Sequence, residues 1–393
     1  MAVRSIDELE LEGKRVFIRV DFNVPIDEDG RVRDDQRIRA AMPTIRHAIK
    51  ARSKVILASH LGRPKGRPDP SYSLEPAGLR LSEILDQEVL LADDCIGDGV
   101  NKMVQDLPPG GVLLLENLRF HSEEEANDPT FAKELASIAD VWVMDAFGTA
   151  HRAHASTAGM AEHVAERAAG FLLKKELDYL DRTLKDPQKP FVVILGGAKV
   201  SDKIKVIDAL IARCQFLLIG GAMAYTFLSA KGSSVGGSRV EKGSVEQARR
   251  ILGRASERGV EVLLPIDHVV ALDLEGVGRR ITEGVDIPHG VMGLDIGPRT
   301  TELFREKIET AGTVFWNGPL GLFENAAFSK GTFAIAKAIA EASCISVVGG
   351  GDSAAAVDQA GISDKVTHVS TGGGASLELV EGRGLPGVIA LEQ

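Results

Sequence analysis

Two lysines near the middle of the chain are placed where they could hold a phosphate group. Lys199 and Lys203 lie four residues apart and follow an apolar run, 191–195, that ends at a pair of glycines. The run is short and rich in β-branched residues, which is typical of a strand buried on both faces. If a helix begins just after the glycines, both lysines project from its first turn, where the helix dipole is already positive and favours a bound anion. The pattern therefore predicts a phosphate site, and the alternative is a surface turn with two solvated lysines.

Glycine-rich segments follow the other apolar runs in the second half of the chain. Because glycine has no side chain, the backbone can approach a ligand closely and turn its N–H groups toward phosphate oxygens. Asp352 follows three glycines at the expected start of a helix. It is either an N-cap or a carboxylate that reaches phosphate-bound Mg²⁺, an ion that takes only one or two protein carboxylates. Glu324 is either a helix-start acid or an acceptor for a ribose hydroxyl. We therefore expect a nucleotide at the segments 196–199, 220–222, 317–319, 349–353 and 370–374.

Arginine and histidine residues follow the apolar runs of the first half. Residues 1–169 contain fifteen arginines and six lysines, and a guanidinium group holds a carboxylate or phosphate in a fixed fork. Arg37 stands at an expected helix start, where a cation is unfavourable unless an anion is near. Each residue alone is as readily a surface arginine, but the carboxyl ends of parallel strands meet at one edge of a sheet. The pattern predicts a basic bowl for a small, multiply anionic substrate, formed by Arg37 with the segments 19–25, 59–64, 116–119 and 145–154.

Short apolar runs alternate with helix-like segments along the chain. This alternation is typical of parallel sheets covered by helices on both faces, and ten runs are too many for one ordinary sheet. The runs are 15–20, 54–59, 111–115, 141–144, 191–195, 216–219, 262–264, 313–316, 345–348 and 367–370. Helices are expected at 130–139, where Asp128 and Pro129 form a typical start, and at 243–258 and 301–311.

A leucine stripe marks the boundary between the two halves. Within 171–185, leucines recur at helical spacing at positions 173, 177, 180 and 184, and prolines at 187 and 190 end the segment. We therefore expect an α/β fold with two Rossmann-like domains, each a mainly parallel sheet covered by helices, joined by this helix and forming a hinged cleft. The expected boundaries are 1–169 for the first domain, 170–186 for the interdomain helix and 187–376 for the second domain.

The composition is that of an ordinary globular protein. A formal charge of −10 disfavours nucleic acid as a partner. The three cysteines are far apart and lack paired spacing, so we expect a reducing compartment with neither a disulfide framework nor a zinc site. The acidic N-terminus does not resemble a secretory signal, and no apolar run is long enough to span a membrane. A cytoplasmic location without membrane partners is therefore expected.

Two other function classes remain as alternatives. The chain lacks the phosphate-binding motif of Walker-type NTPases, whereas 349–354 matches the loose dinucleotide fingerprint. The acid that this fingerprint expects about 20 residues later is absent at 370–372. An NAD(P)-dependent oxidoreductase is therefore disfavoured, and so is an exported solute-binding protein, because no export signal is present.

Together, these segments resemble phosphoglycerate kinase, a family that acts in glycolysis and gluconeogenesis. The matching segments are 19–25, 59–64, 116–119, 148–154, 195–203, 293–298, 316–319, 349–352 and 370–376. By position, the resemblance implies that 3-phosphoglycerate is held by Asp21, Asn23, Arg37, His60, Arg63, Arg119 and Arg152. It implies that ADP or ATP contacts Lys199, Lys203, Gly221, Gly293, Asn317, Glu324, Gly350, Gly351, Asp352 and Ser353, with Asp352 acting through Mg²⁺. Ala222 and Ser353 stand where relatives often carry Gly and Thr, and Met292 lies in a variable stretch.

The resemblance also implies a mechanism. A phosphoryl group passes reversibly between 1,3-bisphosphoglycerate and MgADP, giving 3-phosphoglycerate and MgATP. Because the acceptor carboxylate is already ionised near neutral pH, we expect no general base and no covalent enzyme intermediate. Arg37, Lys199 and Lys203 are the expected catalytic residues, and backbone N–H groups at Gly372 and Gly373 are expected to stabilise the transition state. Family members are monomers that close about a hinge, with a C-terminal tail, here about 377–393, packed on the first domain.

Overall fold

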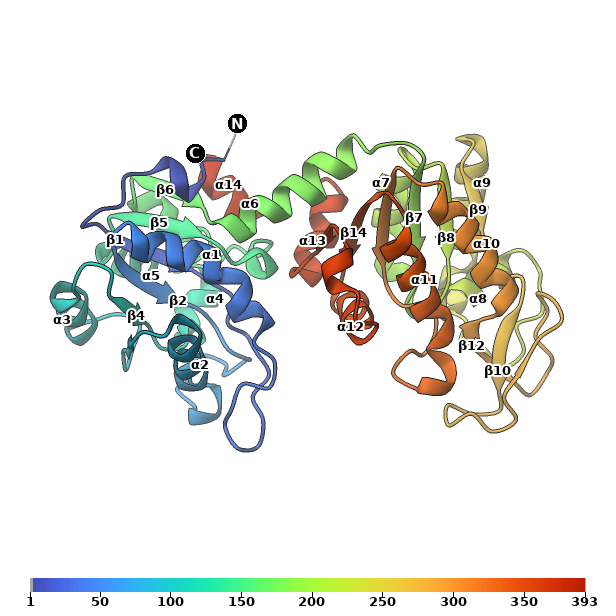
Figure 1. Ribbon diagram of the computed structural model, residues 1–393, viewed down its shortest axis with the longest axis horizontal. Coiled ribbons are helices and arrows are strands. Elements are labelled where there is room, and N and C mark those ends of the chain that lie inside the picture. Colours follow the sequence, from blue (N-terminus) through green and yellow to red (C-terminus); the bar gives the residue numbers. More distant parts are fainter. Residues whose placement is uncertain (1–2, 393) are drawn as a thin grey trace. The chain divides into compact units, whose positions relative to one another are not determined.

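The chain forms two compact units, each with its own sheet. The computed structural model describes residues 3–392, apart from the side chain at position 182 (Figure 1). The first unit holds the residues up to Asp178 and those from Gly384 onward, and the second holds Tyr179–Arg383. Among the described residues, no helix combines the length and the apolar character needed to cross a bilayer.

The first unit contains a parallel sheet of six strands. In spatial order these are β3 (Val89–Leu91), β4 (Val112–Leu114), β2 (Lys54–Ala58), β1 (Arg15–Arg19), β5 (Val141–Met144) and β6 (Glu166–Ala169). Its helices are α1 (Gln36–Lys50), α2 (Glu75–Leu85), α3 (Asp98–Asp106), α4 (Ser122–Ala126), α5 (Pro129–Ser137), α6 (Phe171–Leu177) and α14 (Pro386–Glu392). Strand residues such as Ile18 and Val143 and helix residues such as Ile38 and Ile45 are fully buried in one core. This core fixes the strand ends that carry the candidate substrate residues.

The second unit contains a parallel sheet and a smaller antiparallel one. The larger sheet runs β15 (His368–Val369), β14 (Ile345–Gly349), β13 (Thr313–Asn317), β7 (Phe191–Leu195), β8 (Phe216–Ile219) and β9 (Glu261–Leu263). The smaller one runs β11 (Arg280–Ile281), β10 (His268–Ala271) and β12 (Met292–Ile296). The helices are α7 (Ile204–Ile211), α8 (Met223–Ala230), α9 (Val245–Glu257), α10 (Pro298–Glu309), α11 (Lys330–Glu341), α12 (Gly351–Gln359) and α13 (Gly373–Val380).

All ten predicted strands are present, and the strands that the sequence missed have physical reasons. β3 and β6 lie at the two edges of the first sheet, where only one neighbour covers each strand. β6 accordingly begins with Glu166 and Arg167, so it has no continuous apolar run. β10, β11 and β12 form an antiparallel sheet, in which the exposed β11 shows no buried pattern at all. Parallel central strands are therefore far easier to predict than edge strands.

The predicted helices are also present, with shifted ends. Asp128 caps α5 as expected, because its carboxylate accepts hydrogen bonds from the N–H groups of Thr130 and Phe131 at 2.9 and 3.0 Å. α10 begins three residues earlier than predicted, at Pro298. The reason is Asp267, whose carboxylate accepts from two N–H groups in the first turn of that helix, including that of Thr300 at 2.8 Å. A capping group from a remote segment cannot be found in the local sequence.

The predicted connecting helix is helical throughout but is not a regular α-helix. α6 is followed directly by a π-helical segment, Asp178–Thr183, and the division between the two units falls at its first residue. Leu173, Leu180 and Leu184 are buried, as the leucine stripe predicted. A π segment adds a residue to the turn, and such segments often occur at functional positions.

The end of the chain packs on the first unit. Gly387 in α14 donates its N–H to the carbonyl of Ala150 at 2.9 Å, and Arg167 Nη1 donates to the carbonyl of Ala390 at 3.2 Å. The sequence placed the start of this tail at about residue 377, whereas α13 belongs to the second unit and the first unit resumes at Gly384.

Candidate functional site

Buried His60 lies among several arginines of the first unit. Burial first, and then the positive charges of Arg19, Arg119, Arg152 and Arg37, hold the pKa of His60 well below its usual range. Arg19 Nη2 lies 3.3 Å from Nδ1 of the ring. Because a guanidinium group can only donate, Nδ1 accepts and the ring proton is on Nε2. His60 is therefore a neutral donor in a strongly cationic setting.

Arg119 is buried and is held by a contact with the loop after β2. It follows β4 in the 3₁₀ turn Leu118–Phe120 and is only 4% exposed. Nη1 donates to the carbonyl of Gly62 at 2.7 Å, and Nε lies 3.4 Å from a carboxylate oxygen of Glu125. Among the described residues, none accepts a hydrogen bond from Nε or Nη2, although both atoms are buried. Buried donors without a hydrogen-bond acceptor are costly on a cation, so Nε and Nη2 favour an anion at this position.

The other predicted substrate residues line the same strand ends. Arg37 lies in the first turn of α1 as expected, and its Nη1 donates to Asp21 Oδ2 at 2.7 Å. The anion that this helix start favours is therefore Asp21 in this structure. Asn23 Oδ1 accepts from the N–H of Gly62 at 2.9 Å, which ties the loop after β1 to the loop after β2. Arg63 is the next residue on that second loop and is exposed.

A buried ion network that the sequence analysis did not single out supports the cluster. Arg19, at the end of β1, is 1% exposed and its Nε donates to Ser156 Oγ at 2.8 Å. The N–H of Ser156 donates in turn to the buried carboxylate of Glu124 at 2.9 Å. Arg19 ends a strand that also begins with an arginine, so the sequence alone did not show that it is buried and needs a partner. Glu124 gave no signal either, since it stands between two other glutamates in an acidic run.

In the second unit, Lys203 forms a compact polar group at the end of β13. Its Nζ donates to the backbone carbonyl of Asn317 at 2.8 Å and also contacts Oδ1 of that side chain. Asn317 Nδ2 donates to the carbonyl of Gly349 at 2.7 Å. Burial lowers the pKa of Lys203 to about 8, while Asp352 and Asp202 oppose that shift. The charged form of Lys203 is therefore less stable here than in water, and a further anion beside it would stabilise that form.

The prediction that both lysines project from a helix start is wrong. α7 begins only at Ile204, after the 3₁₀ turn Ser201–Lys203, and Lys199 lies in the loop before that turn with an exposed side chain. Glu241 Oε2 accepts hydrogen bonds from the N–H groups of Val200 and Ser201 at 2.9 and 3.1 Å. A carboxylate from a remote segment therefore occupies the backbone donors where we expected phosphate.

Several glycines at the strand ends allow close packing between backbone segments of the protein itself, in addition to any ligand contact. A Cβ at Gly196 would lie 2.0 Å from the carbonyl oxygen of Pro319, and one at Gly221 would lie 2.6 Å from the N–H nitrogen of Gly197. The N–H groups of Gly197 and Gly221 donate to backbone carbonyls at 2.8 and 2.9 Å. The expectation that all these glycines free N–H groups for phosphate is therefore too broad.

α12 gives the second unit a helix start with an exposed acid. Gly350, with φ of +94°, precedes the helix, and Gly351 and Asp352 form its first turn. Asp352 is exposed and is not the N-cap, so the capping alternative is wrong. Ser353 is buried and its Oγ accepts from the N–H of Gly318 at 2.5 Å. The first N–H groups of a helix lack intrahelical acceptors, which makes this turn suited to phosphate.

The remaining predicted residues lie elsewhere in the second unit. Gly293 lies in β12, where a Cβ would clash with the hydroxyl of Tyr225. Glu324 is exposed in a turn before α11. Gly372 precedes α13 and donates its N–H to Ser370 Oγ at 3.2 Å, and Gly373 opens that helix and is exposed.

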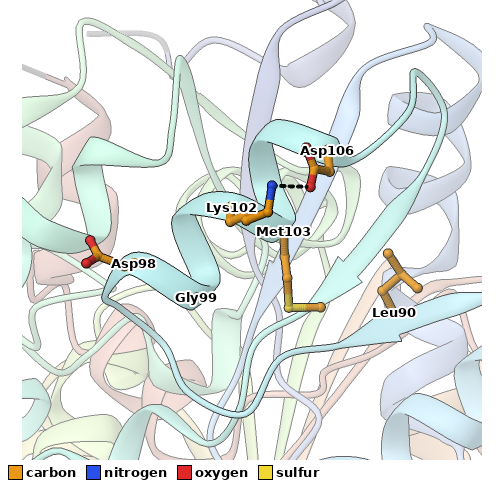
Figure 2. Close-up of a pocket in the computed structure, with 6 residues that line it drawn as sticks. All are labelled: Leu90, Asp98, Gly99, Lys102, Met103 and Asp106. Atoms are coloured by element: carbon orange, nitrogen blue, oxygen red, sulfur yellow. Dashed lines mark ion pairs between the residues drawn. The ribbon is translucent and has the colours of Figure 1, made fainter.

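A surface pocket in the first unit has a different lining. Leu90, Asp98, Gly99, Lys102, Met103 and Asp106 form it along α3 (Figure 2). Lys102 Nζ is paired with Asp106 Oδ2 at 3.1 Å, and both side chains are strongly exposed. None of the predicted substrate or nucleotide residues lines this pocket, so we do not assign the chemistry to it.

Comparisons with known proteins agree along the whole chain. A family model described as phosphoglycerate kinase matches residues 6–383. The phosphoglycerate kinase of Anaeromyxobacter sp. (strain K) is 64% identical over 100% of both chains. The protein named phosphoglycerate kinase, cytosolic, of Triticum aestivum is 52% identical over 100% of this chain and 98% of its own.

Solved structures give the same result. The phosphoglycerate kinase of Coxiella burnetii matches with a TM-score of 0.91 at 40% identity, covering 100% of this chain and 99% of that one. The enzyme from Pyrococcus horikoshii OT3 matches with a TM-score of 0.86 at 36% identity, covering 99% and 98%. These findings confirm both the resemblance and the predicted fold class of two mainly parallel α/β sheets. The chain belongs to the phosphoglycerate kinase family.

Proposed function

We propose that the chain catalyses the reversible glycolytic transfer of a phosphoryl group between 1,3-bisphosphoglycerate and MgADP, giving 3-phosphoglycerate and MgATP. Family membership over residues 6–383 supports this reaction. The single observation in the structure that carries it is the buried fork of Arg119, whose Nε and Nη2 lack an acceptor among the described residues. A multiply anionic substrate supplies the acceptors that this fork needs.

The first unit binds 3-phosphoglycerate through the cluster around His60. Arg119 and Arg152 contribute charge near the ring, and Arg63 adds an exposed guanidinium on the adjoining loop. His60 contributes a neutral Nε2–H donor. Asp21 and Asn23 hold Arg37 and the loop of Gly62 in place, and both have oxygen atoms that suit the substrate hydroxyl. Clustered cations of this kind bind an anion that carries both a phosphate and a carboxylate.

The second unit binds the nucleotide at the ends of its parallel strands. Lys199 and Lys203 contact the phosphates, together with the first turn of α12 at Gly350, Gly351 and Ser353. Asn317 holds Lys203 in position. Gly221 allows a close backbone approach, while Gly293 and Glu324 serve the base and the ribose.

The family uses ADP or ATP with Mg²⁺, and one residue of the second unit fits this ion. Asp352 is an exposed carboxylate beside a helix start that suits phosphate, and Mg²⁺ usually takes one or two protein carboxylates together with phosphate oxygens and water. When bound, the ion neutralises phosphate charge during transfer. Asp352 would hold it there.

The chemistry itself needs positioning and charge rather than a base. The acceptor is a carboxylate that is ionised near neutral pH, so no proton has to be removed from it. Arg37 from the first unit and Lys199 from the second stabilise the charge on the moving phosphoryl group, and the N–H groups of Gly372 and Gly373 assist. Transfer is direct and in line, without a covalent enzyme intermediate.

Transfer between groups held by two units requires that they close on each other. The hinge is the helical connection at 171–185, with the π-helical segment Asp178–Thr183 at the division between the units. Closure also excludes water that would hydrolyse the acyl phosphate. The functional parts follow the predicted boundaries, with substrate binding in 1–169, the hinge in 170–186 and nucleotide binding from 187 onward, whereas the tail on the first unit begins at Gly384.

The protein acts as a cytoplasmic monomer on small molecules, without nucleic acid or membrane partners. Its net charge of −10 supports the absence of a nucleic-acid role. A relative at 52% identity is named cytosolic, which supports the location.

A coupled assay of the purified chain with 3-phosphoglycerate and MgATP tests the proposal. The wild-type chain should turn over only when both substrates are present. Lys199→Ala should lower kcat by about 10²–10³-fold, more than it weakens nucleotide binding. The matched control Lys205→Ala, on the helix that follows, should retain activity. No turnover of the wild-type chain would overturn the proposed function, whereas full activity of Lys199→Ala would overturn only that residue's role.

A further inference from the structure

Three side chains with metal-binding groups meet in the first unit and have no role in the proposed reaction. Asp94, Cys95 and His121 each offer one ligand atom, and these atoms lie within 4.8 Å of one another. In a tetrahedral zinc site, Zn–N and Zn–S distances of about 2.0–2.3 Å place the ligand atoms roughly 3.3–3.8 Å apart. Side-chain movements of about 1 Å would therefore complete the site.

The sheet brings these residues together from separate parts of the sequence. Asp94 and Cys95 follow β3, and His121 follows the turn after β4. β3 and β4 are paired in register, so their carboxyl ends lie side by side. The N–H of Glu116 donates to the carbonyl of Asp94 at 3.4 Å, which joins the two segments. Sequence spacing predicted no zinc site because it detects only ligands that are close along the chain.

The ligand groups are held by contacts with their surroundings. His121 Nε2 lies 2.6 Å from Asp94 Oδ1, and its ring packs against Phe131 with centroids 4.9 Å apart. Cys95 Sγ donates to the carbonyl of Glu116 at 2.9 Å. Cys95 is fully buried, whereas the side chains of Asp94 and His121 are 53% and 24% exposed. An ion can therefore enter from the solvent side at Asp94.

We propose that Asp94, Cys95 and His121 bind one zinc-type divalent ion. A thiolate, an imidazole and a carboxylate are the ligand types that Zn²⁺ and Co²⁺ accept, whereas Mg²⁺ and Ca²⁺ prefer oxygen ligands alone. Binding replaces the thiol proton of Cys95, which is released to solvent, and breaks the hydrogen bond to Glu116. His121 Nε2 faces Asp94 Oδ1, a carboxylate oxygen that accepts a hydrogen bond, so Nε2 carries the ring proton. Binding breaks this hydrogen bond and moves the proton to Nδ1 by way of solvent, which frees the Nε2 lone pair for the ion. Water takes the fourth position.

Binding at this site has a cost that limits its affinity. Burial raises the pKa of the Cys95 thiol well above its usual range, so the ion must displace a tightly held proton. The site also lies next to the substrate cluster, because Arg119 occupies the same 3₁₀ turn that His121 follows. The site is nevertheless independent of the proposed reaction, and its test needs no catalytic activity.

Cobalt titration of the purified full chain tests the proposal. Addition of Co²⁺ should produce a sulfur-to-cobalt charge-transfer band in the near ultraviolet that saturates at one equivalent, and Zn²⁺ should abolish it. Cys95→Ser should eliminate the band. His121→Ala and Asp94→Asn, at more exposed positions, should each weaken Co²⁺ binding by on the order of 10-fold or more. The matched control Cys344→Ser, which removes a partly exposed thiol from the second unit, should leave the band unchanged.

The outcomes separate clearly. Absence of the band in the wild-type chain, or its persistence in Cys95→Ser, overturns the site. So does unchanged Co²⁺ affinity in both His121→Ala and Asp94→Asn, and circular dichroism of each variant verifies its fold. Loss of the band in Cys344→Ser assigns the metal to the second unit instead and equally refutes the proposal.

Discussion

Replacing Arg119 by methionine tests the substrate cluster most sharply. Methionine keeps much of the side-chain volume but removes the two buried donors that have no acceptor in the structure described here. Each charge-assisted hydrogen bond to substrate contributes about 1.5–3 kcal/mol. Loss of two such bonds therefore amounts to about 3–6 kcal/mol, or a decrease in kcat/KM for 3-phosphoglycerate of about 10²–10⁴-fold.

The stability of the same variant should change little. The substitution removes the hydrogen bond from Nη1 to Gly62, but it also removes a guanidinium whose pKa is lowered by burial and by neighbouring arginines. These two changes oppose each other, so we expect the free energy of unfolding in urea to stay within about 2 kcal/mol of wild type. The KM for MgATP should be unchanged, because the nucleotide residues lie in the second unit.

Steady-state kinetics with each substrate varied, together with urea unfolding, gives the measurement. Arg46→Met is the matched control, since Arg46 is an exposed arginine of the same unit that also donates to a backbone carbonyl. It should retain wild-type kinetics. Unchanged kcat/KM for 3-phosphoglycerate in Arg119→Met would refute the proposal that Nε and Nη2 of Arg119 bind this substrate.

Three further predictions concern glycine packing and two perturbed pKa values. Gly196→Ala should destabilise the fold by about 3 kcal/mol or more, because its Cβ would lie 2.0 Å from a backbone oxygen. Gly253→Ala, which has open space around it in α9, should stabilise the fold by about 0.5–1 kcal/mol. Equal unfolding midpoints for the two variants would contradict this prediction. The pKa of Lys203 is about 8 in the unliganded protein, so kcat/KM for MgATP should fall as the pH rises through that value, and a flat profile from pH 7 to 9 would count against its role. Burial raises the pKa of Asp145 to about 7, compared with about 3.9 in the unfolded chain. The folded state therefore keeps a proton that the unfolded state releases, and the free energy of unfolding decreases from about pH 4 to pH 7. Asp145→Asn should remove up to about 4 kcal/mol of this decrease. If the free energy of unfolding of the variant falls between pH 5 and pH 8 as much as that of wild type, the prediction is refuted.

The sequence predicted the central part of each sheet well because burial there is complete. Strands such as β7 and β13 have neighbours on both sides and are buried along their whole length, so they appear as unbroken apolar runs. β6 could not be predicted in this way, because it is an edge strand that starts with two charged residues. Among the antiparallel strands, β11 is exposed and β12 alternates between half-buried and buried residues. β10 is buried but has only four residues and begins with His268, so it gives no long apolar run.

Candidate substrate residues could be proposed from sequence where one residue type recurred at strand ends. Arg37 and Arg119 could be proposed from sequence because each follows a strand or opens a helix. Arg19 and Glu124 could not be assigned, because their roles come from a buried ion network between segments that are distant along the chain.

Backbone donors were harder to assign than charged side chains. Glu241 accepts the hydrogen bonds of Val200 and Ser201, although it lies 40 residues after Ser201. The N–H group of Gly221 is likewise used by another strand end. A glycine-rich segment therefore predicts close backbone approach, but the identity of the group that approaches depends on tertiary structure.

The stereochemical course of transfer tests the account most directly. In the proposed reaction, donor and acceptor meet directly, without a nucleophilic residue of the protein between them. ATP made chiral at the γ-phosphorus, incubated with 3-phosphoglycerate and the purified chain, should therefore give an acyl phosphate with inverted configuration. Retention of configuration would require two successive displacements through a phosphorylated residue and would contradict the account.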